Sequence, residues 1–89
     1  MYAIILYMWY VYILETKDGQ FYTGVTDNIP RRMQEHQDGK GSRFTRIYGF
    51  NQLVYAKEFP TKHKALKRED QIQGWSRQKK LKLIRGELK

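Results

Sequence analysis

Two strand-like segments joined by a short turn constrain the fold of this 89-residue chain more than any other feature. Residues 9–15 and 21–26 are rich in the β-branched and aromatic residues that favour strands. Lys17-Asp18-Gly19 lies between them, and a three-residue loop with glycine in the left-handed position commonly closes a hairpin. We therefore predict an antiparallel hairpin with the pairs Thr16–Gln20, Leu14–Tyr22 and Tyr12–Gly24.

The length of this loop decides whether two tyrosines face the same way. With three residues in the loop, Tyr12 and Tyr22 are diagonal neighbours on one face of the hairpin. A two-residue Asp-Gly turn would put them on opposite faces, because a shift of one residue inverts the side chains. A joint role for the two phenols therefore requires the longer loop, or a bulge with the same effect.

The remaining elements follow from caps and periodicity. Asn28 is a typical helix cap, and Pro30 suits the first turn of a helix that runs to about Gln37, with Ile29 and Met33 as its apolar positions. The pattern then predicts a flexible basic loop at 39–43, a strand at 53–59, a helix at 61–74 and a helix at 76–85 with Leu81 and Ile84 inward. The order ββαβαα predicts an α+β fold, a small three-stranded, mostly antiparallel sheet flanked by three helices. We expect one domain over 1–89, with its core at about 9–85.

A carboxylate stands out in the helix predicted at 61–74. By helical spacing, its inward stripe contains Ala65, Leu66, Glu69 and Ile72. A carboxylate on a buried stripe is costly unless something pairs with it. A metal ion or an arginine would serve, so Glu69 is either a metal ligand or one half of an ion pair.

The charge is concentrated near the carboxyl end of the chain. The net charge is +8, and residues 61–89 hold 10 of the 17 Lys and Arg but only 3 of the 9 Asp and Glu. This asymmetry favours a polyanionic partner, nucleic acid first, over a merely solvated lysine-rich surface. The chain has no cysteine, which is compatible with a reducing, cytoplasmic setting.

The first 14 residues are almost wholly apolar but do not predict membrane insertion. The run is shorter than the roughly 20 residues that a spanning helix needs. It has no basic n-region or cleavage site typical of a signal peptide, and no helical polar face for binding a membrane surface. We expect a strand with an apolar extension at 1–7, and Met8 is a second candidate for the natural start.

Five local signatures, in order, resemble the GIY-YIG nuclease superfamily, specifically its small stand-alone bacterial members. The resemblance covers residue 9 to about residue 85. The signatures are Trp9-Tyr10-Val11-Tyr12-Ile13-Leu14, Tyr22-Thr23-Gly24, Arg31-Arg32-Met33-Gln34-Glu35-His36, Gly39-Lys40-Gly41-Ser42-Arg43-Phe44-Thr45-Arg46 and Ala65-Leu66-Lys67-Arg68-Glu69. Each is weak alone, and their order and spacing together are specific.

The resemblance implies a hydrolytic endonuclease that uses one divalent metal, Mg²⁺ or Mn²⁺. Glu69 would be the only protein ligand of that ion, which suits magnesium because it keeps several waters. Tyr12 would be the general base, Tyr22 would position water or phosphate, and Arg32 would stabilise charge on the phosphate. His36 would assist by hydrogen bonding or by relaying the proton of Tyr12.

The chemistry of a tyrosine base sets a condition on this mechanism. A free tyrosine has a pKa near 10, so only about one in a thousand is ionised at pH 7. Tyr12 therefore needs a pKa lowered by Arg32 or the metal, or a proton relay through His36. A phenolate base predicts cleavage that rises toward alkaline pH.

The chain departs from the family pattern in two ways. Tyr10 replaces the glycine of the first motif, and Val11 and Thr23 replace its isoleucines, but both catalytic phenols remain. The asparagine that many members carry after the metal-binding glutamate is absent, and Arg77 or Lys79 is a candidate replacement. This absence motivates a second hypothesis, a non-catalytic module of the same fold that binds nucleic acid or a nuclease.

Each candidate residue also has a purely structural interpretation. The two tyrosines could pack the sheet, Arg32 could be a surface residue, and His36 could simply pack or cap. Arg31 is expected to pair with Glu35, His63 to be solvated and Trp75 to be a core residue rather than a platform for a base. The residues predicted to bind nucleic acid are Lys40, Arg43, Arg46, Arg77, Lys79 and Lys80.

We expect the substrate to be DNA and the protein to act in repair or recombination. No separate recognition domain is evident in the sequence, which favours recognition of DNA structure or single strands over recognition of sequence. The residues do not distinguish DNA from RNA, and they name no protein partner.

Overall fold

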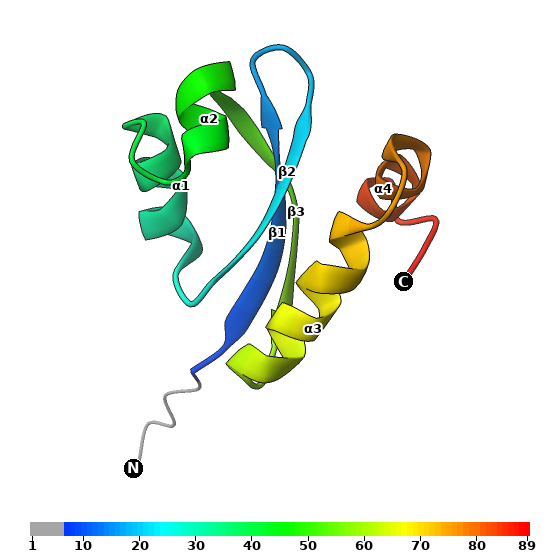
Figure 1. The fold of residues 1–89 in the computed structure, drawn as a ribbon. Helices are drawn as coiled ribbons and strands as arrows, with labels where there is room; N and C mark the ends of the chain where they lie inside the picture. The colour runs from blue at the N-terminus through cyan, green and yellow to red at the C-terminus, as the bar shows by residue number, and fades with distance from the viewer. Residues whose placement is uncertain (1–6) are drawn as a thin grey trace.

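The computed structural model describes residues 7–89 as a three-stranded antiparallel sheet with helices on both faces (Figure 1). The strand order is β2-β1-β3, so β1 is central. Helices α1 and α2 lie on one side of the sheet, and α3 and α4 lie on the other (Figure 1). The elements are β1 (Trp9–Thr16), β2 (Phe21–Thr26), α1 (Ile29–Gln37), α2 (Arg43–Tyr48), β3 (Phe50–Phe59), α3 (Lys62–Gln73) and α4 (Arg77–Ile84).

The hairpin has the predicted three-residue loop. Leu14 pairs with Tyr22 and Tyr12 pairs with Gly24, as expected. The backbone N–H of Thr16 donates to the carbonyl of Gln20 at 2.8 Å, and Gly19 has a φ of 83°, in the left-handed region. The register that brings the two tyrosines to one face is therefore confirmed.

The segment between α1 and β3 differs from the prediction. Residues 43–48 form a helix, α2, where the glycines and basic residues suggested a loop. Ser42 caps this helix, because its Oγ accepts the N–H of Thr45 at 3.1 Å. Strand β3 begins at Phe50, three residues earlier than predicted, and its pairing with β1 is interrupted by two register shifts. The extra helix leaves the sheet itself as predicted.

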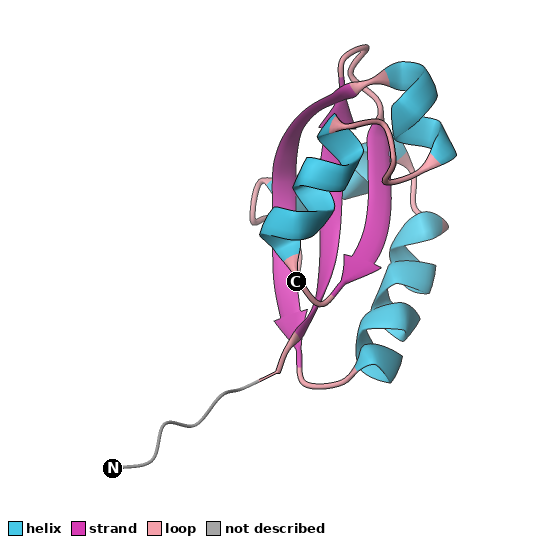
Figure 2. Ribbon diagram, turned by 90° about the vertical axis from the view of Figure 1, so that its left-hand side faces the viewer, coloured by secondary structure: helices cyan, strands magenta, loops and turns pink. Residues whose placement is uncertain are grey.

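The other helix boundaries agree with the caps read from the sequence. Asn28 Oδ1 accepts the N–H of Arg31 at 3.0 Å, and α1 ends at Gln37. Thr61 and Ser76 cap α3 and α4 in the same way. Seen from the α1 side, the three strands lie side by side behind this helix (Figure 2).

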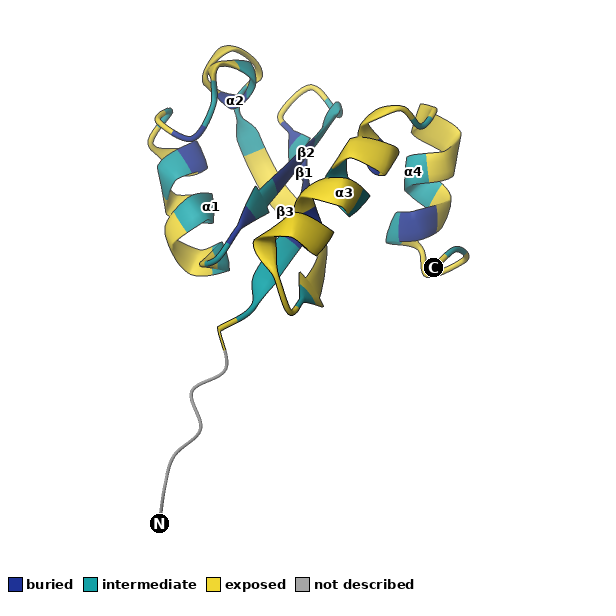
Figure 3. Ribbon diagram, turned by 60° about the horizontal axis from the view of Figure 1, so that its bottom comes forward, coloured by how far each residue is buried: buried dark blue, intermediate teal, exposed yellow. Residues whose placement is uncertain are grey.

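The apolar core lies between the sheet and the α3–α4 pair. Val11 and Ile13 of β1 pack there with Ala65, Ile72 and Leu83. Burial follows the central strand, while the outer face of α3 is exposed (Figure 3).

Two positions in these helices correct the predicted core. Leu66 is 44% exposed, because the face of α3 that meets the sheet is centred on Ala65 and Ile72 instead. On α4, Leu83 is the buried residue, and Leu81 and Ile84 are half-buried. Trp75 packs partly buried against the core and His63 is exposed, both as predicted.

The predicted extension at 1–7 lies outside the described residues except for Tyr7, which is exposed. Among residues 7–89, none of the helices is long and apolar enough to cross a membrane.

Candidate active site

The first tyrosine of the site lies directly over a glycine of the neighbouring strand. Tyr12 is fully buried on the α1 side of the sheet, and its cross-strand partner is Gly24. A Cβ atom added at Gly24 would stand only 2.5 Å from Cζ of Tyr12. The phenol therefore occupies the space that any larger residue at position 24 would fill.

Three rings meet beside this glycine. The ring centroids of Tyr12 and Tyr22 are 6.4 Å apart, and each is edge-on to His36 at 5.7 and 5.4 Å. Tyr22 is half-buried and also stacks on Phe44 of α2, with centroids 5.8 Å apart. The hairpin and α1 thus bring together two phenols and an imidazole that are separated in the sequence.

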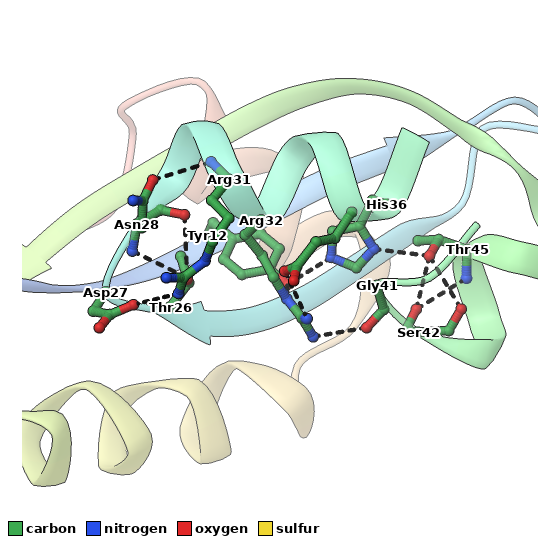
Figure 4. Close-up of polar contacts among 11 residues, drawn as sticks. Tyr12, Thr26, Asp27, Asn28, Arg31, Arg32, His36, Gly41, Ser42 and Thr45 are labelled. Carbon is green, nitrogen blue, oxygen red and sulfur yellow. Dashed lines mark hydrogen bonds and ion pairs between the residues drawn. The ribbon is translucent and has the colours of Figure 1, made fainter. Parts of the chain in front are cut away.

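The Tyr12 hydroxyl is hydrogen-bonded on both sides (Figure 4). It lies 2.7 Å from Nε2 of His36, and it accepts a hydrogen bond from Nε of Arg32 at 3.3 Å. Arg32 and His36 are one helical turn apart on α1, so one helix face supplies both groups. Both ring nitrogens of His36 are hydrogen-bonded, Nε2 to the Tyr12 hydroxyl and Nδ1 to Oγ1 of Thr45.

The remaining donors of Arg32 fix its guanidinium in place. Nη1 donates to Glu35 at 3.3 Å, and Nη2 donates to the carbonyl of Gly41 at 2.7 Å. The predicted pair between Arg31 and Glu35 is therefore wrong. Arg31 instead pairs with Asp27 at 2.7 Å, one turn earlier, because Glu35 faces Arg32.

The electrostatics of the site favour neutral forms of both Tyr12 and His36. Burial raises the pKa of Tyr12 to about 12, and the hydrogen bond from Arg32 offsets this only in part. Burial, followed by the charge of Arg32, lowers the pKa of His36 to about 4. Burial opposes the charge of Arg32, but its bonds to Tyr12 and Glu35 outweigh this, so the pKa of Arg32 is raised. Arg32 alone does not bring the pKa of Tyr12 below its usual value, so the metal and the relay through His36 remain of the routes named from sequence.

Glu69 lies across the edge of β2 from these groups. Its Oε2 accepts a hydrogen bond from Nε2 of Gln73 at 3.2 Å, and the same Nε2 donates to the backbone carbonyl of Thr23 at 3.1 Å. Thr23 stands between Tyr22 and Gly24, so Gln73 links the carboxylate to the strand that carries the site. Within residues 7–89, Glu69 forms no ion pair with Lys or Arg.

The chemistry of this carboxylate fits a magnesium-type ion. No group of three or more His, Cys, Asp or Glu that could hold a metal is present in the described part of the chain. A site with Glu69 as the sole protein ligand suits an ion that keeps most of its waters. It would not suit zinc, which takes three or four protein ligands.

Residues 39–46, which include three of the residues predicted to bind nucleic acid, also contact the side chains of the candidate site. Lys40, Arg43 and Arg46 are exposed, as a surface for nucleic acid requires. The residues between them hold the site: Gly41 accepts from Arg32, and a Cβ added there would stand 2.6 Å from Cγ of His36. Thr45 Oγ1 lies 2.8 Å from Nδ1 of His36.

The basic residues predicted on α4 lie against aromatic rings. The Arg77 guanidinium is 4.4 Å from the centre of the Phe21 ring, and its Nη1 donates to the carbonyl of Gly19 at 2.7 Å. Nζ of Lys79 lies 4.3 Å from the centre of the Trp75 ring. Arg77, Lys80, Gln20 and Phe21 line a small pocket of about 210 Å³. These cations are anchored on the core side of the sheet.

Sequence reasoning missed Gln73, Gly41, Ser42 and Thr45. Gln73 follows Glu69 by four residues, so helical spacing could have identified it. Ser42 and Thr45 have the spacing of a helix cap and its third residue, which would have revealed α2. The contact between Thr45 and His36 joins two helices and has no local signal.

Comparisons with known proteins identify the family of this chain. The family model for the GIY-YIG catalytic domain matches residues 8–82. A UPF0213 protein of Staphylococcus saprophyticus is 51% identical over 75 residues, covering 84% of this chain and 92% of its own. A UPF0213 protein of Staphylococcus epidermidis is 43% identical over 75 residues, with the same coverage.

A solved structure shows the same fold. The solution NMR structure of a UPF0213 protein from Bacillus halodurans is 45% identical and superposes with a TM-score of 0.55, covering 86% of this chain and 82% of the other. The chain therefore belongs to the GIY-YIG nuclease superfamily, together with the UPF0213 proteins that it resembles.

Proposed function

We propose that this protein is a divalent-metal-dependent endonuclease that hydrolyses phosphodiester bonds in DNA. One observation carries this assignment: the buried Tyr12 hydroxyl lies between the guanidinium of Arg32 and the neutral imidazole of His36. A hydroxyl that can pass its proton to a neighbouring base, beside a fixed positive charge, suits the activation of water next to a phosphate.

Tyr12 would act as the general base by passing its own proton on to His36. Because burial raises the pKa of Tyr12, a standing phenolate is rare at neutral pH. His36 is neutral there, and its Nε2 is within hydrogen-bond distance of the phenol. In the proposed step, water gives a proton to the oxygen of Tyr12 as that oxygen releases its own proton to His36. The resulting hydroxide attacks phosphorus, and the leaving oxygen takes a proton from solvent.

Arg32 would give up one of its hydrogen bonds in order to bind the phosphate. Its side chain covers the Tyr12 hydroxyl, which is inaccessible to water in the free protein. The contact with the half-exposed Glu35 carboxylate is the longest and most solvated of the remaining bonds, and a phosphate could replace it. Tyr22, which is half-buried beside Tyr12, would contact the same phosphate or its water.

Glu69 would hold a Mg²⁺ or Mn²⁺ ion at the edge of β2, with Gln73 orienting its carboxylate. When bound, such an ion would neutralise charge on the phosphate.

The surface next to Tyr22 supports recognition of single strands or of DNA structure. Tyr22, Phe44 and Tyr48 form a row of rings, with centroids 5.8 and 4.8 Å apart. The exposed cations of α2 flank this row, and such combinations bind unpaired bases by stacking. Single-stranded and branched DNA occur in repair and recombination. We therefore propose that the protein acts in these processes, in the cytoplasm.

A non-catalytic module of the same fold is the second candidate. The burial of Tyr12 and the occupied donors of Arg32 favour it, because a free site for phosphate is not preformed. Such a module would bind nucleic acid or a nuclease through its basic residues.

Cleavage of defined DNA substrates separates the two functions. Labelled single-stranded, duplex, flap and branched DNA would be incubated with Mg²⁺, Mn²⁺ or EDTA, alongside Tyr12→Phe and Glu69→Ala. Metal-dependent cutting that both substitutions abolish, with binding retained, supports the endonuclease. Tight, salt-sensitive binding without cutting in either metal supports the module. Cutting that survives both substitutions would refute this site.

A further inference from the structure

A buried chain of polar groups continues behind the Tyr12 hydroxyl. Tyr12, His36 and Thr45 are 0, 1 and 2% exposed. His36 Nε2 lies 2.7 Å from the phenol, and its Nδ1 lies 2.8 Å from Oγ1 of Thr45 (Figure 4). Thr45 Oγ1 donates in turn to the carbonyl of Ser42 at 3.3 Å. Buried side chains from β1, α1 and α2 are thus joined in series, and the series ends at the backbone of the half-buried Ser42.

The direction of the first hydrogen bond follows from Arg32. Arginine nitrogens only donate, so the Tyr12 oxygen accepts from Arg32 Nε. The phenol proton then needs an acceptor of its own, and Nε2 of His36 is the one within reach. Nε2 must therefore carry a lone pair and not a proton.

The direction of this hydrogen bond fixes the direction of the next one, between His36 and Thr45. A neutral imidazole without a proton on Nε2 carries it on Nδ1, which then donates to Thr45 Oγ1. Thr45 can accept that bond because its own proton has an acceptor in Ser42, either the carbonyl oxygen at 3.3 Å or Oγ at 2.9 Å. In the opposite tautomer the Tyr12 proton would be buried without an acceptor, which is costly. The Nδ1–H tautomer therefore satisfies the donors of Tyr12, His36 and Thr45, whichever oxygen of Ser42 takes the Thr45 proton.

We propose that Thr45 is a positioning residue that holds His36 in the Nδ1–H tautomer and so keeps Nε2 available for the proton of Tyr12. This inference rests on the proposed function for its catalytic consequence. Its structural part stands separately, because the tautomer exists in the free protein. When Tyr12 passes its proton on, His36 gains one proton at Nε2 and becomes an imidazolium. It later returns that proton to solvent.

The neighbours of Thr45 hold it in place for this role. Its backbone N–H is capped by Ser42 Oγ, which fixes the first turn of α2. Gly41 lies against the His36 ring, which occupies the space that a Cβ at position 41 would need. Thr45 is the residue that bonds to Nδ1.

The test is the ¹⁵N NMR spectrum of the histidine rings in the full chain at neutral pH. The protein has two histidines, so His63→Gln assigns the signals of His36. We expect Nδ1 of His36 to be protonated and Nε2 to be unprotonated in the wild type. In Thr45→Val, which removes the hydroxyl but keeps the shape, we expect the Nε2–H tautomer to become populated. Thr45→Ser should restore the wild-type pattern.

Thr23→Val is the matched control for this spectrum. Thr23 is also a buried threonine, but within the described residues its hydroxyl has no partner, so its loss should leave the His36 signals unchanged. Nε2–H in the wild type, or an unchanged tautomer in Thr45→Val, would overturn the inference. If Thr45→Val does not fold, the wild-type spectrum and Thr45→Ala decide it by the same criteria.

Kinetics test the catalytic consequence. Thr45→Val should lower kcat for cleavage by about ten- to a hundredfold with little change in KM, and Thr45→Ser should recover most of it. An unchanged kcat in a variant with the altered tautomer would refute the catalytic role. If the wild type cleaves no substrate, the proposed function fails, but the spectrum still answers the question of the tautomer.

Discussion

The hydroxyl of Tyr12 and Nε2 of His36 lie 2.7 Å apart, in a part of the protein where neither side chain meets solvent. In this pair, burial raises the pKa of the phenol and lowers that of the imidazole. Both groups are therefore neutral over a wide pH range, and the hydrogen bond between them joins a neutral phenol to a neutral imidazole.

The pH dependence of cleavage should reflect this pair. If Tyr12 passes its proton to His36, the rate of the chemical step should be nearly flat between pH 7 and 9, far from both pKa values of about 12 and 4. A pre-formed phenolate would instead give about a tenfold rise per pH unit. Single-turnover rates at saturating metal distinguish them, and a tenfold slope would contradict the relay.

Stability should fall in acid because of His36. Its folded pKa of about 4 lies below its usual value of 6.5, so the unfolded chain binds a proton more readily between these values. The free energy of unfolding should therefore decrease as pH falls from 6.5 to 4, on the order of 3 kcal/mol from this residue. Urea unfolding across this range would measure the loss.

The other histidine provides the control for that experiment. His63 is exposed, so His63→Gln should keep the wild-type slope, whereas His36→Gln should reduce it. Equal slopes in the two variants would show that His36 is not held neutral by the fold.

The glycine beneath Tyr12 should not tolerate a methyl group. Gly24→Ala would place Cβ against the phenol ring and displace it, costing roughly 1–3 kcal/mol and most of the cleavage activity. Gly74→Ala is the matched control, because a Cβ there meets only ordinary contact at 3.7 Å. Thermal unfolding and cleavage rates of the two variants test this. A fully active Gly24→Ala protein would contradict the tight contact between Tyr12 and residue 24.

Thr23→Val should stabilise the protein. The Thr23 hydroxyl is buried and, among the described residues, without a hydrogen-bond partner, so replacing it with a methyl group should gain about 1 kcal/mol. Thr26→Val should do the opposite, because the Thr26 hydroxyl accepts the N–H of Asn28 at 3.1 Å. Denaturant unfolding at pH 7 compares the two, and a loss of stability in Thr23→Val would indicate a partner for that hydroxyl.

Gln73 should affect metal affinity without being a ligand. Gln73→Leu removes the bond that orients Glu69, so the Kd for Mn²⁺ should rise by about tenfold or more. Gln71→Leu, on the same helix and equally exposed, should leave the Kd unchanged. Calorimetric titration of Mn²⁺ measures both, and equal affinities would remove Gln73 from the site.

Local chemistry explains which parts of this structure could be predicted. The Lys17–Gly19 loop specified the register of Tyr12 and Tyr22, because loop length and glycine conformation are properties of adjacent residues. The Asn28 cap likewise gave the start of α1. The predicted pair of Arg31 and Glu35 failed because spacing alone cannot choose between Arg31 and its neighbour Arg32.

Helix α2 and the contact between Thr45 and His36 could not be predicted in this way. The basic residues of 39–46 suggested a loop that meets phosphate, and they concealed the cap that starts α2. The bond between Thr45 and His36 depends on how two helices pack, and no pattern within either helix encodes that distance. The tyrosines, the arginine and the glutamate were predicted from the resemblance to the family, whereas the groups that contact them were not.

The two glycines of the site bear on how related proteins should be sorted into active and inactive ones. Gly24 and Gly41 contribute empty volumes, one filled by the Tyr12 ring and one by the His36 ring. A protein that retains every reactive side chain but carries alanine at either place would have lost the room in which those side chains are arranged. A search for inactive members of this superfamily should therefore examine the residues that align with these two glycines as carefully as the functional groups.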